Sequence, residues 1–218
     1  MSTPGSGNGK RDDLLVEIGV EELPHSFIAD AARRFAEEFT SLLKESRIPF
    51  GEWKGFSTPR RLALLVRDVA RAQEDYVVEK RGPALQRAYL PDGSPSPALQ
   101  GFLRSNDSGS GKTVVRESGG GTYVFLERVV RGLAASELLP AVLEKTLAAL
   151  PFPKVMRWEK SGFLFARPIR WIVFLHGRDV VPFAVAGVSS SRASFGHRAY
   201  ARGPVELSCP AEYEDCLL

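Results

Sequence analysis

A long amphipathic helix set among short strands is the feature that most constrains the fold of this chain. Apolar residues recur at spacings of four and three over 28–42, which lines them along one face of a helix predicted at 26–46. A strand-like apolar run at 14–20 precedes this helix, and strand signals at 53–56 and 62–69 follow it. A strand, a helix and two further strands make a compact α+β unit.

The rest of the chain continues this mixture of strands and helices. A hairpin is predicted over 113–130, a second amphipathic helix over 136–150 and a last hairpin over 169–188. The predicted fold class is therefore α+β, with mixed, mostly antiparallel sheets and two main amphipathic helices.

The 218 residues are enough for one large domain or for two small ones. Residues 1–13 are polar at their start and rich in glycine and serine, and they are predicted to form a disordered leader. A first α+β unit is then predicted over 14–75 and a second over 76–218. One continuous domain is the alternative to these two sub-domains.

The overall composition is that of an ordinary globular protein. The chain has 29 lysines and arginines against 26 acidic residues, and a net charge of +3 is too weak to imply nucleic acid by itself. Cys209 and Cys216 match no zinc or redox spacing, which fits a reducing compartment. No signal peptide is visible, and the longest apolar run is too short to cross a bilayer. We expect a cytoplasmic protein with no membrane partner.

Basic charge is concentrated in one aromatic-rich stretch, residues 152–171. Between Lys154 and Arg170 the local charge balance is +4, and Trp158 and Trp171 are interleaved with the cations. Planar cations beside aromatic rings hold phosphates and stack on bases, so one interpretation is a surface that faces a polyanion. The other is a strand end whose arginines lie on the surface while the aromatic rings fill a core. Composition alone favours the second.

Residues 109–113 resemble the end of a phosphate-binding P-loop. The motif needs a glycine where this chain has Asn106, a buried strand before it and a helix after it. A polar stretch precedes this segment and a β-branched run follows it, which favours a hairpin lead-in. A nucleotide-hydrolysing enzyme that uses Lys112 is the alternative function, and Lys112→Ala would abolish its ATP hydrolysis.

No catalytic constellation is visible in the sequence. Glu17, Glu21 and Glu22 cluster near a turn, but only His25 lies near them and no metal-ligand spacing occurs there. We therefore predict no catalytic residue and no metal site in this chain.

Six short motifs, in order, point to one family. The chain resembles the bacterial glycyl-tRNA synthetase beta subunit family in residues 15–24, 58–63, 79–83, 152–158, 165–168 and 196–198. These motifs extend from Leu15 to Arg198. Val20 departs from the pattern, which has threonine at this position.

The resemblance implies a non-catalytic role in a larger enzyme. Members of the family are several times longer and carry a C-terminal HD-like domain and an anticodon-binding domain, so the chain is expected to be an N-terminal fragment. In the family a separate alpha subunit holds the active site, where glycine and ATP form the adenylate. The beta subunit serves tRNA handling and the active heterotetramer. The implied partners are the alpha subunit and glycine tRNA, with ATP and magnesium at the alpha subunit and no cofactor on this chain.

The candidate RNA-binding residues are the cations of these motifs. The first group would neutralise tRNA phosphates, with one tryptophan as a stacking platform: Lys154, Arg157, Trp158, Arg167, Arg170 and Arg198. The second group comprises Arg60, Arg61, Lys80 and Arg81. The alternative is a scaffold role, for instance Arg167 pairing with Glu17 or Glu21, and it is favoured for the second group. A pure assembly module without RNA affinity is a third possibility, which a tRNA titration over a salt series would separate.

Overall fold

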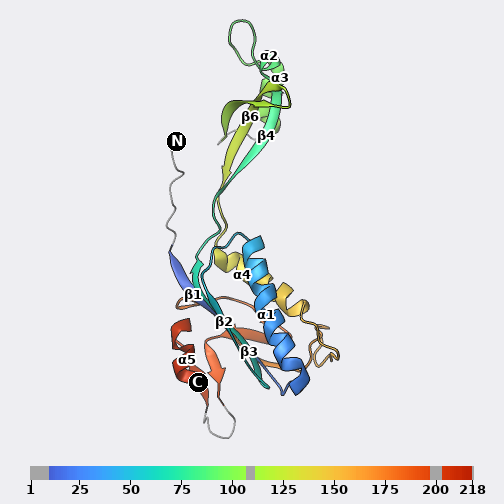
Figure 1. Ribbon diagram of the computed structural model, residues 1–218, viewed down its shortest axis with the longest axis vertical. Helices are drawn as coiled ribbons and strands as arrows, with labels where there is room; N and C mark the ends of the chain where they lie inside the picture. Colours follow the sequence, from blue (N-terminus) through green and yellow to red (C-terminus); the bar gives the residue numbers. More distant parts are fainter. Residues whose placement is uncertain (1–9, 107–110, 197–202, 218) are drawn as a thin grey trace. The chain divides into compact units, whose positions relative to one another are not determined.

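The computed structural model describes residues 10–106, 111–196 and 203–217 and divides into two compact units (Figure 1). The larger unit comprises Met1–Gln73 and Leu133–Leu218, and the smaller unit, Glu74–Gly132, is inserted between these halves. The predicted division into 14–75 and 76–218 differs from this one. The predicted boundary after residue 75 lies close to the observed boundary after Gln73. The chain after residue 132, however, returns to the larger unit, where its strands pair with those of the first half.

A seven-stranded mixed sheet is the centre of the larger unit. Its strands run in the order β2-β3-β1-β7-β10-β9, with β8 paired to β7, and only the β7–β10 pairing is parallel. The strands are β1 (Arg11–Val20), β2 (Trp53–Thr58), β3 (Arg61–Ala70), β7 (Ile169–His176), β8 (Asp179–Val180), β9 (Ala184–Val185) and β10 (Val188–Ser191). The middle strands β1 and β7 are thus neighbours although about 150 residues separate them in sequence.

The first strand begins earlier than the predicted leader allows. Residues 11–13 belong to β1, where Asp12 binds Arg71 at 2.6 Å and Asp13 binds Arg67 at 2.5 Å. These ion pairs hold the polar start of the strand against the end of β3. The rest of the predicted leader, residues 1–9, lies outside the described residues.

Helices α1 (His25–Glu45) and α4 (Ala135–Ala148) cover one face of this sheet and form the main core with it. The odd-even alternation of β1 points Leu14, Val16 and Ile18 at this core, where they meet Phe35 and Phe39 of α1. The prediction of α1 is confirmed to within one residue at each end. The helix begins after Pro24 without a side-chain cap.

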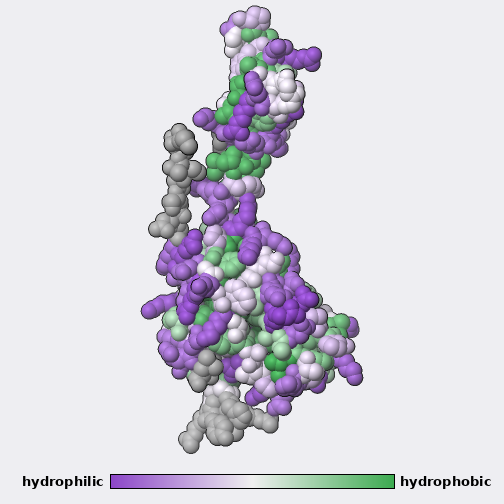
Figure 2. All heavy atoms as spheres, in the orientation of Figure 1, coloured by the Kyte–Doolittle hydropathy of each residue, from purple (hydrophilic) through white to green (hydrophobic). Residues whose placement is uncertain are grey.

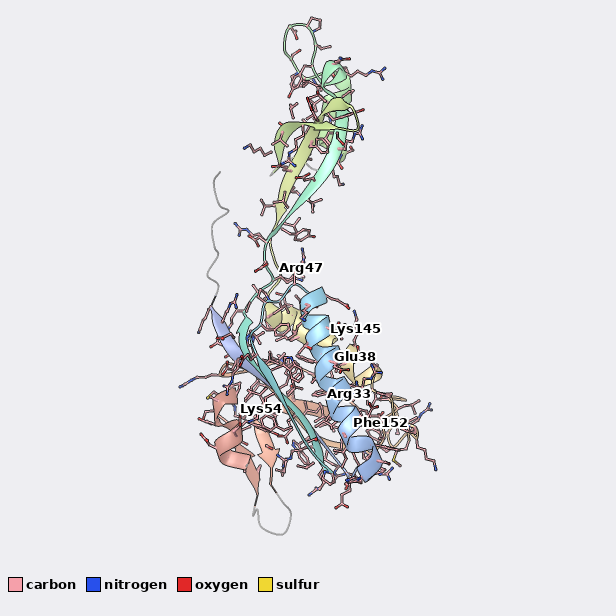
Figure 3. All side chains as sticks on the ribbon, viewed as in Figure 1. Arg33, Glu38, Arg47, Lys54, Lys145 and Phe152 are labelled. Atoms are coloured by element: carbon pink, nitrogen blue, oxygen red, sulfur yellow. The ribbon has the colours of Figure 1, made fainter. Side chains whose placement is uncertain are left out.

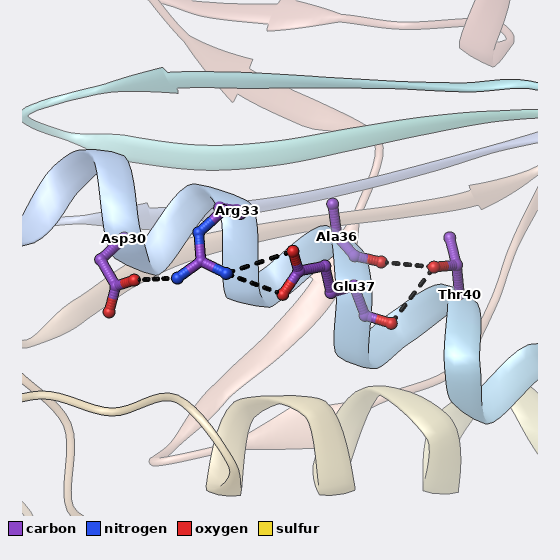
Figure 4. Close-up of polar contacts among 5 residues, drawn as sticks. All are labelled: Asp30, Arg33, Ala36, Glu37 and Thr40. Carbon is purple, nitrogen blue, oxygen red and sulfur yellow. Dashed lines mark hydrogen bonds and ion pairs between the residues drawn. The ribbon is translucent and has the colours of Figure 1, made fainter.

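The outer face of α1 is polar (Figure 4). Arg33 binds Asp30 and Glu37 on neighbouring turns of this face, whereas the Thr40 hydroxyl is buried and donates to the Ala36 carbonyl at 2.8 Å. The helix therefore shows one apolar and one charged face, as the spacing predicted.

The opposite face of the sheet carries a second, smaller core. Leu15, Leu65 and Leu175 lie side by side there and pack with Tyr213. Further elements on this part of the chain are β11 (Ala193–Phe195), β12 (Pro204–Glu206), the 3₁₀ helix η2 (Pro210–Glu212) and α5 (Tyr213–Leu217). Lys54 reaches toward α5, where it binds Glu214, while Phe152 lies beside α1 (Figure 3). Each face of the sheet thus has its own cover.

The smaller unit is a three-stranded antiparallel sheet in the order β4-β6-β5 with two short helices. Its elements are β4 (Tyr76–Ala84), α2 (Leu85–Ala88), α3 (Pro97–Ser105), β5 (Lys112–Ser118) and β6 (Gly121–Val130). Lys112 opens β5, so a strand follows it where a P-loop needs a helix; Gly109 and Ser110 lie outside the described residues.

The α+β fold class with mostly antiparallel sheets is confirmed. No helix in the described ranges combines the length and the apolar character needed to cross a membrane.

His176 makes the stability of the larger unit depend on pH. This residue is buried at the end of β7 with its Nε2 atom 3.1 Å from the Val69 carbonyl oxygen. Burial lowers the pKa of His176 below its ordinary value of 6.5. As the pH falls below 6.5, the unfolded chain takes up a proton that the folded chain resists, so stability is lost.

We predict that this loss is absent in His176→Gln. Urea unfolding between pH 7.5 and 5 should show the free energy of wild-type unfolding falling relative to the variant, by at most about 1.4 kcal/mol per pH unit. Parallel pH profiles for the two proteins would contradict the prediction.

Candidate functional site

Three of the six motifs meet at one end of the central sheet, and a fourth begins beside them. The turn after β1 is bonded through its backbone to both neighbours: the Leu23 amide donates to the Pro59 carbonyl at 2.6 Å and the Glu21 amide to the Pro168 carbonyl at 3.0 Å. The fourth motif begins at Gly196, directly after β11, and β11 lies against the same sheet. Motifs distant in sequence therefore form one structural site.

The centre of this site is the carboxylate of Glu17, which is fully buried. It accepts hydrogen bonds from Trp171 Nε1 at 2.5 Å and from the Ser194 hydroxyl at 2.8 Å, and Arg61 Nη1 lies 3.6 Å away. We call these four residues the glutamate cluster. A buried charge is tolerated only when it is paired and hydrogen-bonded, so the three partners on β3, β7 and β11 are what allow Glu17 to be there.

Gly19 leaves the space that Trp171 occupies. The two residues are paired across β1 and β7, and a Cβ atom on Gly19 would lie 1.9 Å from the indole ring. The ring therefore lies directly on the glycine backbone, which brings its N–H group to Glu17. Arg61 pairs with Gly19 on the other side.

A pocket of about 500 Å³ opens beside the glutamate cluster. Aromatic rings from four elements line it, namely Phe56, Trp171, Phe195 and Tyr213, together with the arginine pair of residues 60–61. The Arg60 guanidinium lies over the Trp171 ring, 5.9 Å from its centroid. Burial and, second, the Glu17 carboxylate raise the pKa of the Tyr213 phenol, which stays neutral.

The aromatic residues of the stretch 152–171 fill a core, as the scaffold interpretation predicted. Phe152 packs edge-on against Phe165 at 4.8 Å, and Phe163 stacks on Phe165 at 5.9 Å. Trp158 packs edge-on against Phe163 at 6.3 Å and is half-buried against the main core. This packing gives the surrounding loop a rigid base.

The cations of this loop point outward. We call residues 153–164 the basic loop; its exposed cations are Lys154, Arg157 and Lys160, and none of them forms a salt bridge with a described residue. Its one acid, Glu159, instead accepts hydrogen bonds from Ser161, which lower its pKa. Hydrophobic side chains also reach the surface around this loop (Figure 2): Val155, Met156 and Leu164 are 41–50% exposed. The loop thus offers free positive charge beside apolar surface.

The next two arginines are engaged at the turn after β1. Arg167 Nε donates to the Glu22 carbonyl at 3.2 Å, and Arg170 Nε lies 3.3 Å from the Glu21 carboxylate. The suggested pairing of Arg167 with Glu17 or Glu21 was wrong. Arg61 forms the ion pair with Glu17, and Arg170 forms the ion pair with Glu21. Arg198 lies outside the described residues.

Lys80 and Arg81 belong to the smaller unit. Lys80 Nζ donates to Asn106 Oδ1 at 2.7 Å, and the Arg81 guanidinium lies 3.6 Å from the Tyr123 ring centroid. Both residues are exposed and make local contacts.

The role of Glu17 was not predicted, although the sequence held a signal for it. Glu17 and Gly19 interrupt the alternation of large apolar residues on one face of β1. An acid in the middle of a strand that is buried on both faces requires buried partners.

Within the part of the chain that the structure describes, no three side chains of the kinds that bind metals lie close enough together to hold a metal ion.

We predict that Gly19→Ala destabilises the larger unit by at least about 3 kcal/mol, because the new methyl group displaces Trp171 from Glu17. Urea unfolding followed by circular dichroism measures this loss. Gly55→Ala in β2 is the matched control, since its Cβ would meet only one atom, the Ala63 carbonyl oxygen at 4.0 Å. Equal stability of the two variants would contradict the geometry.

Comparison with known proteins agrees with the motifs. The family model described as glycyl-tRNA synthetase beta subunit matches residues 14–218. The glycine–tRNA ligase beta subunit of Desulfitobacterium hafniense (strain DSM 10664 / DCB-2) is 40% identical over 206 residues, which are 94% of this chain and 30% of that protein. That of Bacillus subtilis (strain 168) is 39% identical over 207 residues, 95% of this chain and 30% of that protein.

The chain spans about 30% of the length of these curated relatives. The family match, by contrast, covers almost all of the chain, including every motif. The chain belongs to the glycyl-tRNA synthetase beta subunit family.

Proposed function

We propose that the chain is a non-catalytic part of the beta subunit of a glycine–tRNA ligase, which supports tRNA binding and assembly with the catalytic alpha subunit. In this proposal glycine, ATP and magnesium react at the alpha subunit within a cytoplasmic heterotetramer. The chain itself contributes surfaces and no reacting group.

The basic loop is the observation that carries the proposal. Three exposed cations without salt-bridge partners among the described residues lie within seven positions, from Lys154 to Lys160. Such cations are available to neutralise phosphates at no cost in broken ion pairs. Arg170 at the start of β7 is exposed as well, but it is paired with Glu21.

The backbone and packing contacts that hold the basic loop in place support a binding role. The backbones of Met156 and Phe165 bond to each other in both directions, at 2.8 and 3.3 Å, and closely packed rings lie beneath. A loop that is rigid before binding loses little conformational entropy on binding. The exposed Val155 and Leu164 suit a protein surface, and we assign them to contact with the alpha subunit.

The glutamate cluster supports the non-catalytic part of the proposal. Its charges, Glu17 and Arg61, lie deep in the fold and are directed at each other and at structural partners. This ion pair gives the motifs 15–24 and 58–63 a structural role, so no part in a reaction is needed to explain them. The cations used for binding are those left outside this cluster.

We predict that replacing Lys154 and Arg157 together by alanine weakens binding of glycine tRNA to this chain and flattens its salt dependence. The slope of log K against log salt should fall by about 1.4–1.8, because two phosphate contacts are lost. Fluorescence anisotropy of labelled tRNA at 50–200 mM salt measures both quantities.

Removal of two exposed cations elsewhere, Arg34 and Arg178, is the charge-matched control. The same weakening in both double variants would mean that only net charge matters, and would contradict a site at the basic loop.

Sedimentation of the wild-type chain with the alpha subunit, without tRNA, tests assembly. Co-sedimentation of the two proteins supports assembly through this chain, and separate boundaries oppose it.

A further inference from the structure

The pocket beside the glutamate cluster has the dimensions and chemistry of a small-ligand site. Its volume of about 500 Å³ lies in the range of known ligand pockets, roughly 300–1,000 Å³. Four of its lining residues are aromatic, and the polar groups come from the 57–61 segment and Glu22. An apolar pocket with a few convergent polar groups is the usual form of a binding site.

The pocket offers one exposed aromatic ring, that of Phe195, to a planar ligand. Trp171 and Phe195 lie 5.1 Å apart at an angle of 56°, and Phe56 packs against Tyr213 at 5.5 Å. Phe195 is 38% exposed, so its ring is accessible rather than covered by the core. Aromatic faces of this kind stack on nucleobases whatever their sequence.

The pocket also offers a positive charge that no carboxylate of the described residues neutralises. Arg61 is neutralised by Glu17, but Arg60 forms no salt bridge with any residue that the structure describes. The Arg60 guanidinium sits over Trp171, at the edge of the aromatic surface. An anionic group attached to a stacked ring would fall beside it.

Two buried polar atoms of the pocket residues lack partners. Neither Arg61 Nε nor the Tyr213 hydroxyl makes a hydrogen bond within the described residues, although both are buried and Tyr213 is 1% exposed. Orphaned buried donors are rare because each costs free energy. Both atoms are buried beneath the pocket wall, next to Glu17, and are not exposed to a ligand in the pocket.

We infer that this pocket binds a nucleotide, with the base stacked on the exposed ring of Phe195 and the phosphate on Arg60. The Arg60 guanidinium supplies donors for the phosphate oxygens. The site does not depend on tRNA binding by the basic loop, which it does not include. The nucleotide is either free or part of a single-stranded RNA segment.

Titration calorimetry with the whole chain tests the inference. AMP should bind at least about tenfold more tightly than adenosine, and Arg60→Gln should remove this difference while leaving adenosine binding in place. Arg34→Gln is the matched control and should bind as wild type. Phe195→Ala should weaken AMP and adenosine alike, because it removes a stacking face without touching Glu17.

The source of the nucleotide is tested with a short single-stranded oligoadenylate. Tighter binding of the oligomer than of AMP, lost in Arg60→Gln, identifies an RNA segment, and equal or weaker binding identifies a free nucleotide. Absence of AMP and oligomer binding at millimolar concentration would overturn the inference. Binding unchanged in both Arg60→Gln and Phe195→Ala would do the same. Equal affinity for an acidic peptide would also overturn it, in favour of a protein partner.

Discussion

The buried carboxylate of Glu17 is the interaction on which the rest of the larger unit depends. One side chain on β1 bonds to residues on β7 and β11 and pairs with an arginine on β3. Removing any partner leaves a charge or a donor unsatisfied in an environment without water. Glu17 therefore fixes which strands lie together and in what register.

The motifs of the family divide into two groups around this constraint. Glu17 and Arg61 turn inward and stabilise the junction of strands, while the cations of the basic loop turn outward. The same loop buries its aromatic rings, so the two interpretations of the stretch 152–171 apply to different atoms of it. Charge at a motif position is thus no guide to its role until burial is known.

Local patterns predicted the elements well. The period of α1 and the apolar runs of β1 and β3 identified these segments because propensity and packing agree there. The return of β7 to pair with β1 was not predictable, since pairing across about 150 residues is decided by packing rather than by local pattern. For the same reason the insertion of residues 74–132 was missed.

The candidate site was predicted in part. The motifs named the segments that meet, but not the small residues that let them meet: Gly19 beneath Trp171 and Ala63 beside Glu17. The pocket escaped prediction because it is formed by segments far apart in the chain, from Phe56 to Tyr213.

A double-mutant cycle between Glu17→Gln and Ser194→Ala is the most direct test of the central role of Glu17. The two residues are 177 positions apart in sequence, so their hydrogen bond forms only in the folded chain. Urea unfolding of the four proteins should give a coupling free energy of about 1–3 kcal/mol, typical of a hydrogen bond to a buried charge. A coupling near zero would contradict the view that Glu17 holds these strands together.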